Sequence, residues 1–273
     1  MAKAKERVDV LAVEQGLAPS REKAKALILA GLISVKGIKI DKPGTEISAE
    51  SELVLQGPGC PYVSRGGLKL AKALRSFPID LNHKVVLDVG ASTGGFTDCA
   101  LQNGAAKVFA VDVGYGQLAW YLRSDPRVVC MDRTNARYLS AEALGEKVDF
   151  ATIDVAFISL DKILPALKSL FNPTNELVAL IKPQFEAGKD KVGKKGVVRD
   201  PAVHREVLRK VLTMAEHNGY AIRGLDYSPV KGPEGNIEYL AWLSFTGTEN
   251  PTGFDWITQV DEVVEAAHQD LPK

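Results

Sequence analysis

The stretch Leu87-Asp88-Val89-Gly90-Ala91-Ser92-Thr93-Gly94-Gly95-Phe96-Thr97 determines how the rest of the chain is interpreted. The apolar run over 85–89 is typical of a strand buried on both faces, and a helix is expected over 97–103. The glycines between them remove Cβ atoms, so a nucleotide-like ligand could approach bare backbone at a helix N-terminus. A tight strand-to-helix turn also needs glycine for steric reasons alone. The loop by itself therefore leaves both interpretations open.

From residue 85 onward the sequence alternates between expected strands and helices. The strands are expected over 85–89, 107–112, 127–131, 149–154, 176–182, 220–227 and 237–245. The helices are expected over 97–103, 116–123, 160–170 and 201–218. This alternation predicts an α/β, Rossmann-like domain with a mostly parallel sheet. The last two strands are joined only by residues 228–236, too few for a parallel crossover, so the seventh strand should be antiparallel.

A doubly wound sheet with a reversed last strand is associated with methyl transfer from S-adenosylmethionine, and two strand ends fit that ligand. Asp112, about twenty residues beyond the glycine loop, could accept hydrogen bonds from a ribose diol. Asp132 could accept one from an adenine amino group. Either aspartate is also an ordinary turn former at a strand end. The residues predicted to bind the cofactor are Asp88, Gly90, Ser92, Thr93, Gly94, Gly95, Phe96, Asp112 and Asp132.

Three charged residues stand where a buried sheet should be apolar. Asp154 and Lys182 end two predicted strands, and Glu238 opens the last one. Charged side chains are rarely buried without partners, and these strand ends should meet at one edge of the sheet. Lys69, on a short helix predicted after Ser64, completes the order Lys–Asp–Lys–Glu. A buried ion pair that closes the sheet would use the same contacts, so the structural and functional interpretations are compatible.

The N-terminal part is basic although the whole chain has no formal net charge. Residues 1–75 carry 13 Lys and Arg against 8 Asp and Glu. Two helices are expected within 7–31, the second capped by Ser20, followed by a hairpin around Lys36-Gly37. Such a segment favours binding to an anion, and lysines that merely solvate a small domain are the alternative. The predicted organisation is a domain over 1–58, a linker over 59–66 and a second domain over 67–273.

The N-terminal pattern resembles a known RNA-binding domain. The order Arg7-Val-Asp-Val-Leu-Ala, Ser20-Arg-Glu-Lys-Ala-Lys and Gly31-Leu-Ile-Ser-Val-Lys-Gly is similar to the domain named after ribosomal protein S4. The resemblance implies that basic side chains of the second helix and the hairpin face an RNA backbone. Phosphate contacts of this kind position a protein but carry little sequence information.

The resemblance extends over nearly the whole chain. With Val63-Ser-Arg-Gly-Gly-Leu-Lys, the glycine loop and Ile181-Lys-Pro-Gln-Phe-Glu, the charged tetrad resembles the TlyA (haemolysin A) family of ribosomal RNA 2′-O-methyltransferases with an FtsJ-type catalytic domain. It implies methylation of cytidine ribose with S-adenosylmethionine, on RNA within a ribosomal subunit and without a metal. It implies a catalytic tetrad of Lys69, Asp154, Lys182 and Glu238. The residues expected to contact RNA are Arg7, Arg21, Lys23, Lys25, Arg65, Lys189, Lys194 and Lys195.

The tetrad suits removal of a proton from a 2′-hydroxyl. Lys182 is the candidate base, which requires that it be neutral when it accepts the proton. The carboxylates could instead orient this lysine, and Lys69 could hold the target phosphate or ribose. The lysines and glycines of 188–199 predict a mobile basic loop over RNA, with a solvated surface loop as the alternative.

Composition limits the other functions. No stretch approaches the roughly 20 apolar residues of a membrane span, and three scattered cysteines favour a reduced, cytoplasmic protein. A membrane-active haemolysin is one alternative, for which the segment 254–271 could be amphipathic. Its charged face is mostly acidic, so packing onto the domain is the expectation. A non-catalytic RNA-binding protein with the same fold is the other alternative. The sequence does not predict the oligomeric state.

Overall fold

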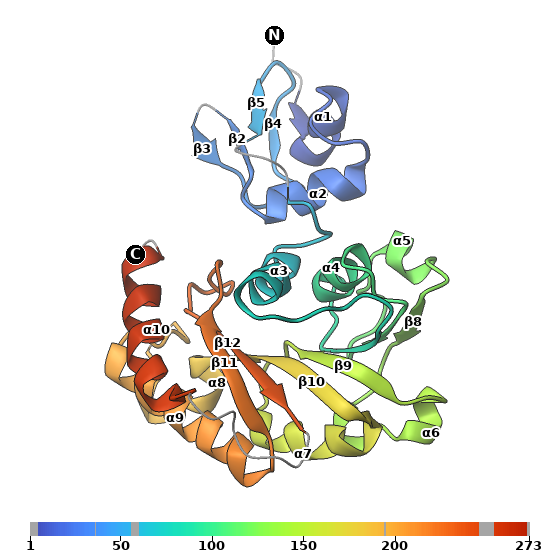
Figure 1. Ribbon diagram of the computed structural model, residues 1–273. Coiled ribbons are helices and arrows are strands. Elements are labelled where there is room, and N and C mark those ends of the chain that lie inside the picture. The colour runs from blue at the N-terminus through green and yellow to red at the C-terminus, as the bar shows by residue number, and fades with distance from the viewer. Residues whose placement is uncertain (1–4, 36, 56–59, 194, 246–253, 272–273) are drawn as a thin grey trace. The chain divides into compact units, whose positions relative to one another are not determined.

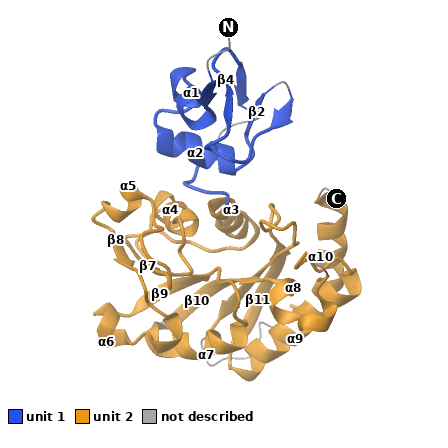
Figure 2. Ribbon diagram, turned by 180° about the vertical axis from the view of Figure 1, so that it is seen from behind, with its two compact units in different colours: residues 1–65 blue, residues 66–273 orange. Residues whose placement is uncertain are grey.

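The computed structural model describes residues 5–35, 37–55, 60–193, 195–245 and 254–271, apart from the side chains of residues 173 and 174 (Figure 1). The chain divides into two compact units, Met1–Arg65 and Gly66–Lys273 (Figure 2). Each unit has its own hydrophobic core.

The first unit combines two helices with two small antiparallel sheets. Its helices are α1 (Val8–Glu14) and α2 (Arg21–Leu29), and its strands are β1 (Lys5–Arg7), β2 (Ile33–Val35), β3 (Ile38–Lys39), β4 (Glu46–Ser48) and β5 (Leu53–Leu55). β1 pairs with β4, and β2 lies between β3 and β5. The Ser20 hydroxyl accepts a hydrogen bond from the Lys23 amide at 3.2 Å, so the predicted cap of α2 is confirmed. Lys36, at the predicted hairpin turn, lies outside the described residues.

The second unit is built on a seven-stranded sheet. Its strands are β6 (Val85–Val89), β7 (Lys107–Val111), β8 (Val128–Met131), β9 (Val148–Ile153), β10 (Phe171–Ile181), β11 (Ala221–Tyr227) and β12 (Tyr239–Ser244). Their order is β11-β12-β10-β9-β6-β7-β8. The strands from β10 to β8 are parallel, and β12 runs antiparallel to both of its neighbours. The predicted sheet with a reversed last strand is confirmed.

Helices cover both faces of this sheet (Figure 1). α3 (Gly66–Ser76) and α4 (Gly95–Gln102) lie on one face, and α7 (Leu164–Leu167) and α9 (Pro201–His217) lie on the other. α10 (Trp256–Asp270) packs against α9 and β11 with Trp256, Val260 and Val264 buried. The apolar side of this last helix is therefore used within the unit, as the sequence predicts.

Two predicted helices are shorter than expected. The one over 116–123 is reduced to α5 (Trp120–Arg123), because Gly116 has φ +68° and cannot continue a right-handed helix. The one over 160–170 is divided into two 3₁₀ turns, η2 (Leu160–Lys162) and η3 (Lys168–Leu170), that flank α7. Pro165, in the first turn of α7, lacks the amide that a continuous helix would need.

Four short helical elements were not predicted. They are η1 (Ala136–Tyr138), α6 (Ala141–Leu144), α8 (Pro183–Glu186) and η4 (Lys189–Lys191). Each is too short for an apolar period of 3.6 residues to be recognised in the sequence.

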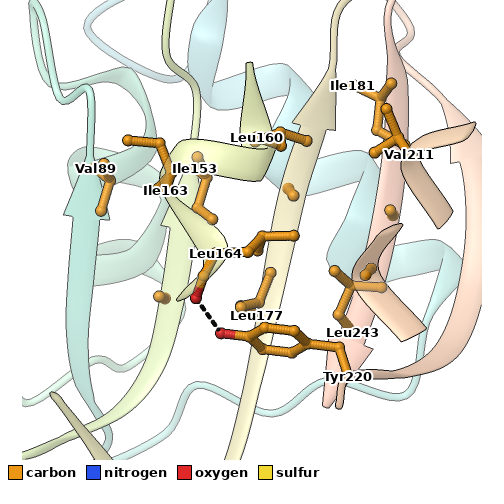
Figure 3. Packing of buried hydrophobic residues seen from close by; sticks show 14 of the residues in the cluster. Val89, Ile153, Leu160, Ile163, Leu164, Leu177, Ile181, Val211, Tyr220 and Leu243 are labelled. Atoms are coloured by element: carbon orange, nitrogen blue, oxygen red, sulfur yellow. Dashed lines mark hydrogen bonds between the residues drawn. The ribbon is translucent and has the colours of Figure 1, made fainter. Parts of the chain in front are cut away.

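The core of the second unit fills the space between the sheet and the α7–α9 layer. Figure 3 shows Leu164 of α7 packed beside Leu177 of β10, with Ile153 of β9 nearby. The hydroxyl of the buried Tyr220 donates a hydrogen bond to the Leu164 carbonyl at 2.8 Å. Each buried leucine contributes about 1.5–3 kcal/mol of burial free energy. This packing fixes the strand ends that carry the site.

Candidate active site

The predicted charged tetrad comes together at one edge of the sheet. Asp154 directly follows β9 and Lys182 directly follows β10. Glu238 directly precedes β12, whose Tyr239 is paired with Ile181 of β10. Because β12 is antiparallel, its beginning lies at the carboxyl ends of β9 and β10. Lys69 reaches the same place from α3.

The four side chains form a continuous row of alternating charge. Lys182 Nζ lies 2.5 Å from Asp154 Oδ1, and the other carboxylate oxygen, Oδ2, lies 3.3 Å from Lys69 Nζ. Lys69 Nζ also donates to Glu238 Oε2 at 2.7 Å. The order Lys182–Asp154–Lys69–Glu238 thus gives each inner residue two partners of opposite charge. The predicted juxtaposition is observed, with Lys69 rather than Lys182 between the carboxylates.

Burial makes these contacts electrostatically strong. The relative exposure is 8% for Lys69, 9% for Lys182 and 1% for Glu238. Burial alone lowers the pKa of Lys69, but the Asp154 and Glu238 carboxylates outweigh it and raise that pKa above its ordinary value. Burial likewise raises the pKa of Asp154, and the charges of Lys69 and Lys182 reverse this and lower it. Lys69 is therefore a fixed cation and Asp154 a fixed anion at neutral pH.

The loop before β12 leaves room for the Glu238 side chain. A Cβ atom on Gly232 would lie 2.7 Å from Glu238 Oε1, so only glycine fits without displacing the carboxylate. The Glu238 carbonyl accepts a hydrogen bond from the Ser228 amide at 2.8 Å, which closes the loop at its base. Gly232 was not singled out from the sequence, because a glycine in a loop that also contains prolines is unremarkable by itself.

The glycine loop between β6 and α4 lies at the same sheet edge. Gly90 has φ +86°, and Gly94, the N-cap of α4, has φ +95° with no side-chain cap. The first-turn amides of an α-helix lack intrahelical partners, so an uncapped start suits a ligand carboxylate. Ser92 and Thr93 are exposed, whereas Gly95 and Phe96 are buried in the first turn. These features fit an amino-acid-like group against bare backbone.

The two strand-end aspartates, Asp112 and Asp132, are held by hydrogen bonds from nearby loops and from α5. Asp112 accepts hydrogen bonds from the amides of Ser92 at 2.8 Å and Gly114 at 2.7 Å. Asp132 accepts from Arg123 at 2.7 Å, a contact that lowers the pKa of its carboxyl group. The lowered pKa keeps Asp132 ionised, and hydrogen bonds hold both carboxylates in place. Their contacts with ribose and adenine remain predictions.

Asp88 is buried and bonded to side chains within the second unit. Its carboxylate is 1% exposed and accepts hydrogen bonds from Thr97 Oγ1 at 2.7 Å and Thr152 Oγ1 at 2.9 Å. Burial raises its pKa to about 6, against the effect of these hydrogen bonds. The observed contacts fasten β6 to α4 and β9 beneath the glycine loop. A direct contact of Asp88 with a cofactor stays a prediction.

Two of the basic residues predicted to contact RNA are paired within the first unit. Arg7 Nε donates to Asp9 Oδ1 at 2.9 Å, and Arg21 Nη2 donates to Asp9 Oδ2 at 3.0 Å. The Asp9 side chain is fully buried, and the hydrogen bond from Arg7 is the largest cause that lowers its pKa, to about 2. Both guanidinium groups stay about half exposed. They are thus positioned rather than free.

The remaining predicted RNA contacts lie in different environments. Lys23 Nζ reaches the Cys60 carbonyl at 3.5 Å, Lys25 is exposed and Arg65 is half-buried. Lys189 lies in the 3₁₀ turn η4 (Lys189–Lys191) and, like Lys195, is exposed. Lys194 lies outside the described residues. The first three, Lys23, Lys25 and Arg65, belong to unit Met1–Arg65, and the three later lysines belong to unit Gly66–Lys273.

Sequence reasoning missed two buried polar residues beside the tetrad. Glu186 accepts hydrogen bonds from Ser159 and from the Leu160 amide, and Asn236 binds backbone groups of Gly196 and Val198. Glu186 ends the quoted stretch Ile181-Lys-Pro-Gln-Phe-Glu, and Asn236 lies two residues before Glu238. Proximity to a predicted catalytic residue was the only available signal for either of them.

The described ranges contain neither a metal-binding cluster nor a membrane-spanning helix. No group of three or more His, Cys, Asp or Glu side chains there is arranged to hold a metal ion. None of the described helices is both long and apolar enough to cross a membrane. Of the three cysteines, Cys99 is buried, and Cys60 and Cys130 are half-buried.

Comparison with known proteins gives matches over both units. The FtsJ-like methyltransferase model matches residues 62–245, and the S4 domain model matches residues 6–53. YqxC of Bacillus subtilis, a candidate rRNA methyltransferase, is 52% identical over 273 residues, 99% of this chain and 97% of its own. The 16S/23S rRNA (cytidine-2′-O)-methyltransferase TlyA of Mycobacterium tuberculosis is 48% identical over 87% of this chain and 89% of its own. A solved structure from Streptococcus thermophilus, described as a candidate hemolysin, has 48% identity and a TM-score of 0.78, covering 98% of each chain.

Proposed function

Because the chain belongs to the TlyA family of FtsJ-like methyltransferases, we propose that it methylates the 2′-hydroxyl of cytidine in ribosomal RNA with S-adenosylmethionine as methyl donor. The observation that carries the proposal is the buried row Lys182–Asp154–Lys69–Glu238 at the sheet edge that also holds the glycine loop. A buried row of four charges is costly unless its partners are arranged for it, and it contributes little to stability compared with apolar packing. A chemical role accounts for its presence.

The residues of the glycine loop suit the donor molecule. Bound S-adenosylmethionine supplies an electrophilic methyl group on a sulfonium. The uncapped start of α4 is suited to its carboxylate, and the ordered carboxylates of Asp112 and Asp132 are suited to its ribose and adenine. Gly90, Ser92, Thr93, Gly94, Gly95 and Phe96 form the backbone against which it would lie.

The two lysines are suited to different tasks. Lys69 donates to two carboxylates that raise its pKa, so it stays charged and could hold a ribose or phosphate oxygen. Lys182 has one carboxylate partner, Asp154, and its Nζ lies beside the Phe185 ring. Lys182 is therefore the candidate that accepts the proton from the 2′-hydroxyl as the oxygen attacks. Asp154 and Glu238 orient the lysines and keep the site neutral overall.

RNA binding is assigned to the S4 unit and to the basic loop after Lys182. The Asp9 carboxylate fixes Arg7 and Arg21, with Lys23 and Lys25 on the same helix as Arg21. Their contacts with phosphates would position the enzyme on a ribosomal subunit without reading sequence. With ribosomal RNA as substrate, we expect the protein to act in the cytoplasm.

The function is tested by mapping methyl marks. Ribosomal subunits from cells that lack the gene are incubated with purified protein and S-adenosylmethionine, and ribose methylation is located by mass spectrometry of RNA fragments. The expected result is a 2′-O-methyl cytidine with wild-type protein and none with Lys182→Ala. Methylation of a base, or no transfer to either subunit, would contradict the proposal.

A further inference from the structure

The segment between Lys182 and the start of α9 is fastened near its beginning to the chain that carries Asp154. Glu186, at the end of α8, is 5% exposed. Its Oε1 accepts a hydrogen bond from the Leu160 amide at 2.8 Å, and its Oε2 accepts one from the Ser159 hydroxyl at 2.5 Å. Ser159 follows Asp154 by only five residues. Glu186 therefore holds the beginning of this loop against the Asp154 segment.

The end of the same loop is fastened to the chain that carries Glu238. Asn236 is 2% exposed, and its Oδ1 accepts a hydrogen bond from the Val198 amide at 3.0 Å. Its Nδ2 donates to the Gly196 carbonyl at 2.8 Å. A buried amide that both accepts and donates a hydrogen bond to one segment of the main chain fixes that segment in position. Asn236 lies two residues before Glu238.

A second buried contact reinforces this end. The Val198 carbonyl accepts a hydrogen bond from His204 Nε2 at 3.0 Å, and His204 Nδ1 lies 2.7 Å from the Tyr239 hydroxyl. A carbonyl only accepts, so His204 carries its proton on Nε2 and the tyrosine hydroxyl donates to Nδ1. Tyr239 directly follows Glu238. Both backbone groups of Val198 are thus tied to residues that flank this carboxylate.

The described part of this loop, residues 187–193 and 195–197, is consequently a strap between the two carboxylate segments. Between its anchors it exposes Lys189 and Lys195, whereas Val197 and Val198 are buried at its end. Asp154 and Glu238 share Lys69, so a shift of either segment changes the position of that lysine relative to Lys182. A displacement of about 1 Å at a reacting group can cost roughly 100-fold in rate.

We propose that Glu186 and Asn236 are positioning residues that transmit RNA binding by the strap to the spacing of Asp154 and Glu238. The inference rests on the proposed function in that the exposed lysines of the strap hold RNA. RNA on the strap fixes both anchors, and the anchors fix the two carboxylates around Lys69. Neither residue touches substrate in this scheme.

Kinetics of anchor variants provide the first test, with ribosomal subunits as substrate. Asn236→Ala and Glu186→Ala are expected to lower kcat by about tenfold to hundredfold while the Kd for S-adenosylmethionine stays within about twofold. Glu186→Gln retains one acceptor for the Leu160 amide and should recover most of the rate. Asn175→Ala is the matched control, because Asn175 is an equally buried amide that binds backbone at Phe245, at the opposite end of β10. It should lower stability without lowering kcat.

Coupling to RNA separates positioning from plain structural support. Lys189→Glu with Lys195→Glu removes the charge on the strap, so adding Asn236→Ala should then lower kcat much less than it does alone. Equal effects of Asn236→Ala in both backgrounds, or a kcat unchanged in the anchor variants while wild-type protein methylates, would overturn the proposal and leave the proposed function intact.

Hydrogen exchange with purified ribosomal subunits gives a readout independent of methyl transfer. RNA is expected to protect the amides of 158–160 and 236–239 in the wild type but not in Asn236→Ala. If protection is seen but no methyl transfer occurs, the coupling stands and the proposed function fails. If these amides gain no protection while the strap does, the coupling is wrong.

Discussion

Gly90 of the glycine loop is in backbone contact with Asp154 of the charged tetrad. A Cβ atom on Gly90 would lie 2.4 Å from the Asp154 carbonyl oxygen, closer than any stable contact. The Asp154 amide also donates to the Val89 carbonyl at 2.9 Å. The loop proposed to hold the methyl donor and the carboxylate proposed to orient both lysines are therefore fixed against each other through the main chain.

The first prediction concerns this contact. Gly90→Ala should force the loop away from Asp154 and lower both S-adenosylmethionine affinity and methyl transfer. The new Cβ would collide with the main chain of Asp154, which cannot rotate away as a flexible side chain could. Positive φ adds about 1 kcal/mol of strain. Gly145→Ala is the control, since Gly145 has φ +77° with open space around it. If calorimetry and turnover assays show equal losses for both variants, strain alone is responsible and the contact is unimportant.

Lys182→Ala should abolish methyl transfer while S-adenosylmethionine still binds. The side chain is the candidate proton acceptor, and Lys182 directly follows β10 and is not part of the glycine loop. Binding is measured by calorimetry and transfer by radiolabelled methyl incorporation into ribosomal RNA. Near-normal turnover in this variant would remove Lys182 from the role of base and favour a purely positional mechanism.

The free energy of unfolding should depend more on Lys69 than on Lys182, although Lys182 is the candidate base for methyl transfer. Lys69→Met leaves Glu238 and Asp154 without their shared cation, and an uncompensated buried charge costs about 3–5 kcal/mol. Lys182→Met leaves Asp154 still paired with Lys69, so the free energy of unfolding should fall by less. Urea denaturation at pH 7 measures both. A larger loss for Lys182→Met would mean that Lys69 is not the central cation of the row.

The charged residues of the site could be predicted from the sequence because they break the apolar pattern of buried strands. Asp154, Lys182 and Glu238 stand out for this reason, and strand direction then brings them to one edge. The partners of each charge could not be predicted in the same way. Lys69 comes from α3, 85 positions before Asp154, and its place between two carboxylates depends on how that helix packs.

The same limit applies to polar residues without an unusual sequence environment. Asp88 looks like a ligand-facing carboxylate in its motif, yet it binds Thr152, which lies 64 positions away. Arg7 and Arg21 look like free cations, yet both are bound to a buried Asp9. Long-range hydrogen bonds leave no periodic signal, so these contacts became visible only in the folded chain.

The pairing of Asp9 predicts how the S4 unit responds to acid. Its pKa is about 2 in the folded unit against an ordinary value of 3.8, so the folded chain binds fewer protons than the unfolded chain below pH 4. The stabilisation is complete above pH 4 and is lost as the pH falls toward 2. Asp9→Asn should flatten this dependence when the hydrogen exchange of α1 and α2 is followed in the full chain. An acid dependence that is unchanged in this variant would contradict the assignment.

His204 predicts a second dependence at milder pH. This imidazole is fully buried, touched by His268 and near Asp200, and burial lowers its pKa from 6.5 to about 4. Between pH 6.5 and pH 4, His204 takes up a proton in the unfolded chain but not in the folded chain. The free energy of unfolding therefore falls as the pH is lowered through this range. The loss amounts to up to about 3 kcal/mol. Urea denaturation between pH 6.5 and pH 5 should show a steeper loss for the wild type than for His204→Gln. Parallel pH dependences would mean that His204 titrates alike in both states and does not hold Val198 and Tyr239 as a neutral ring.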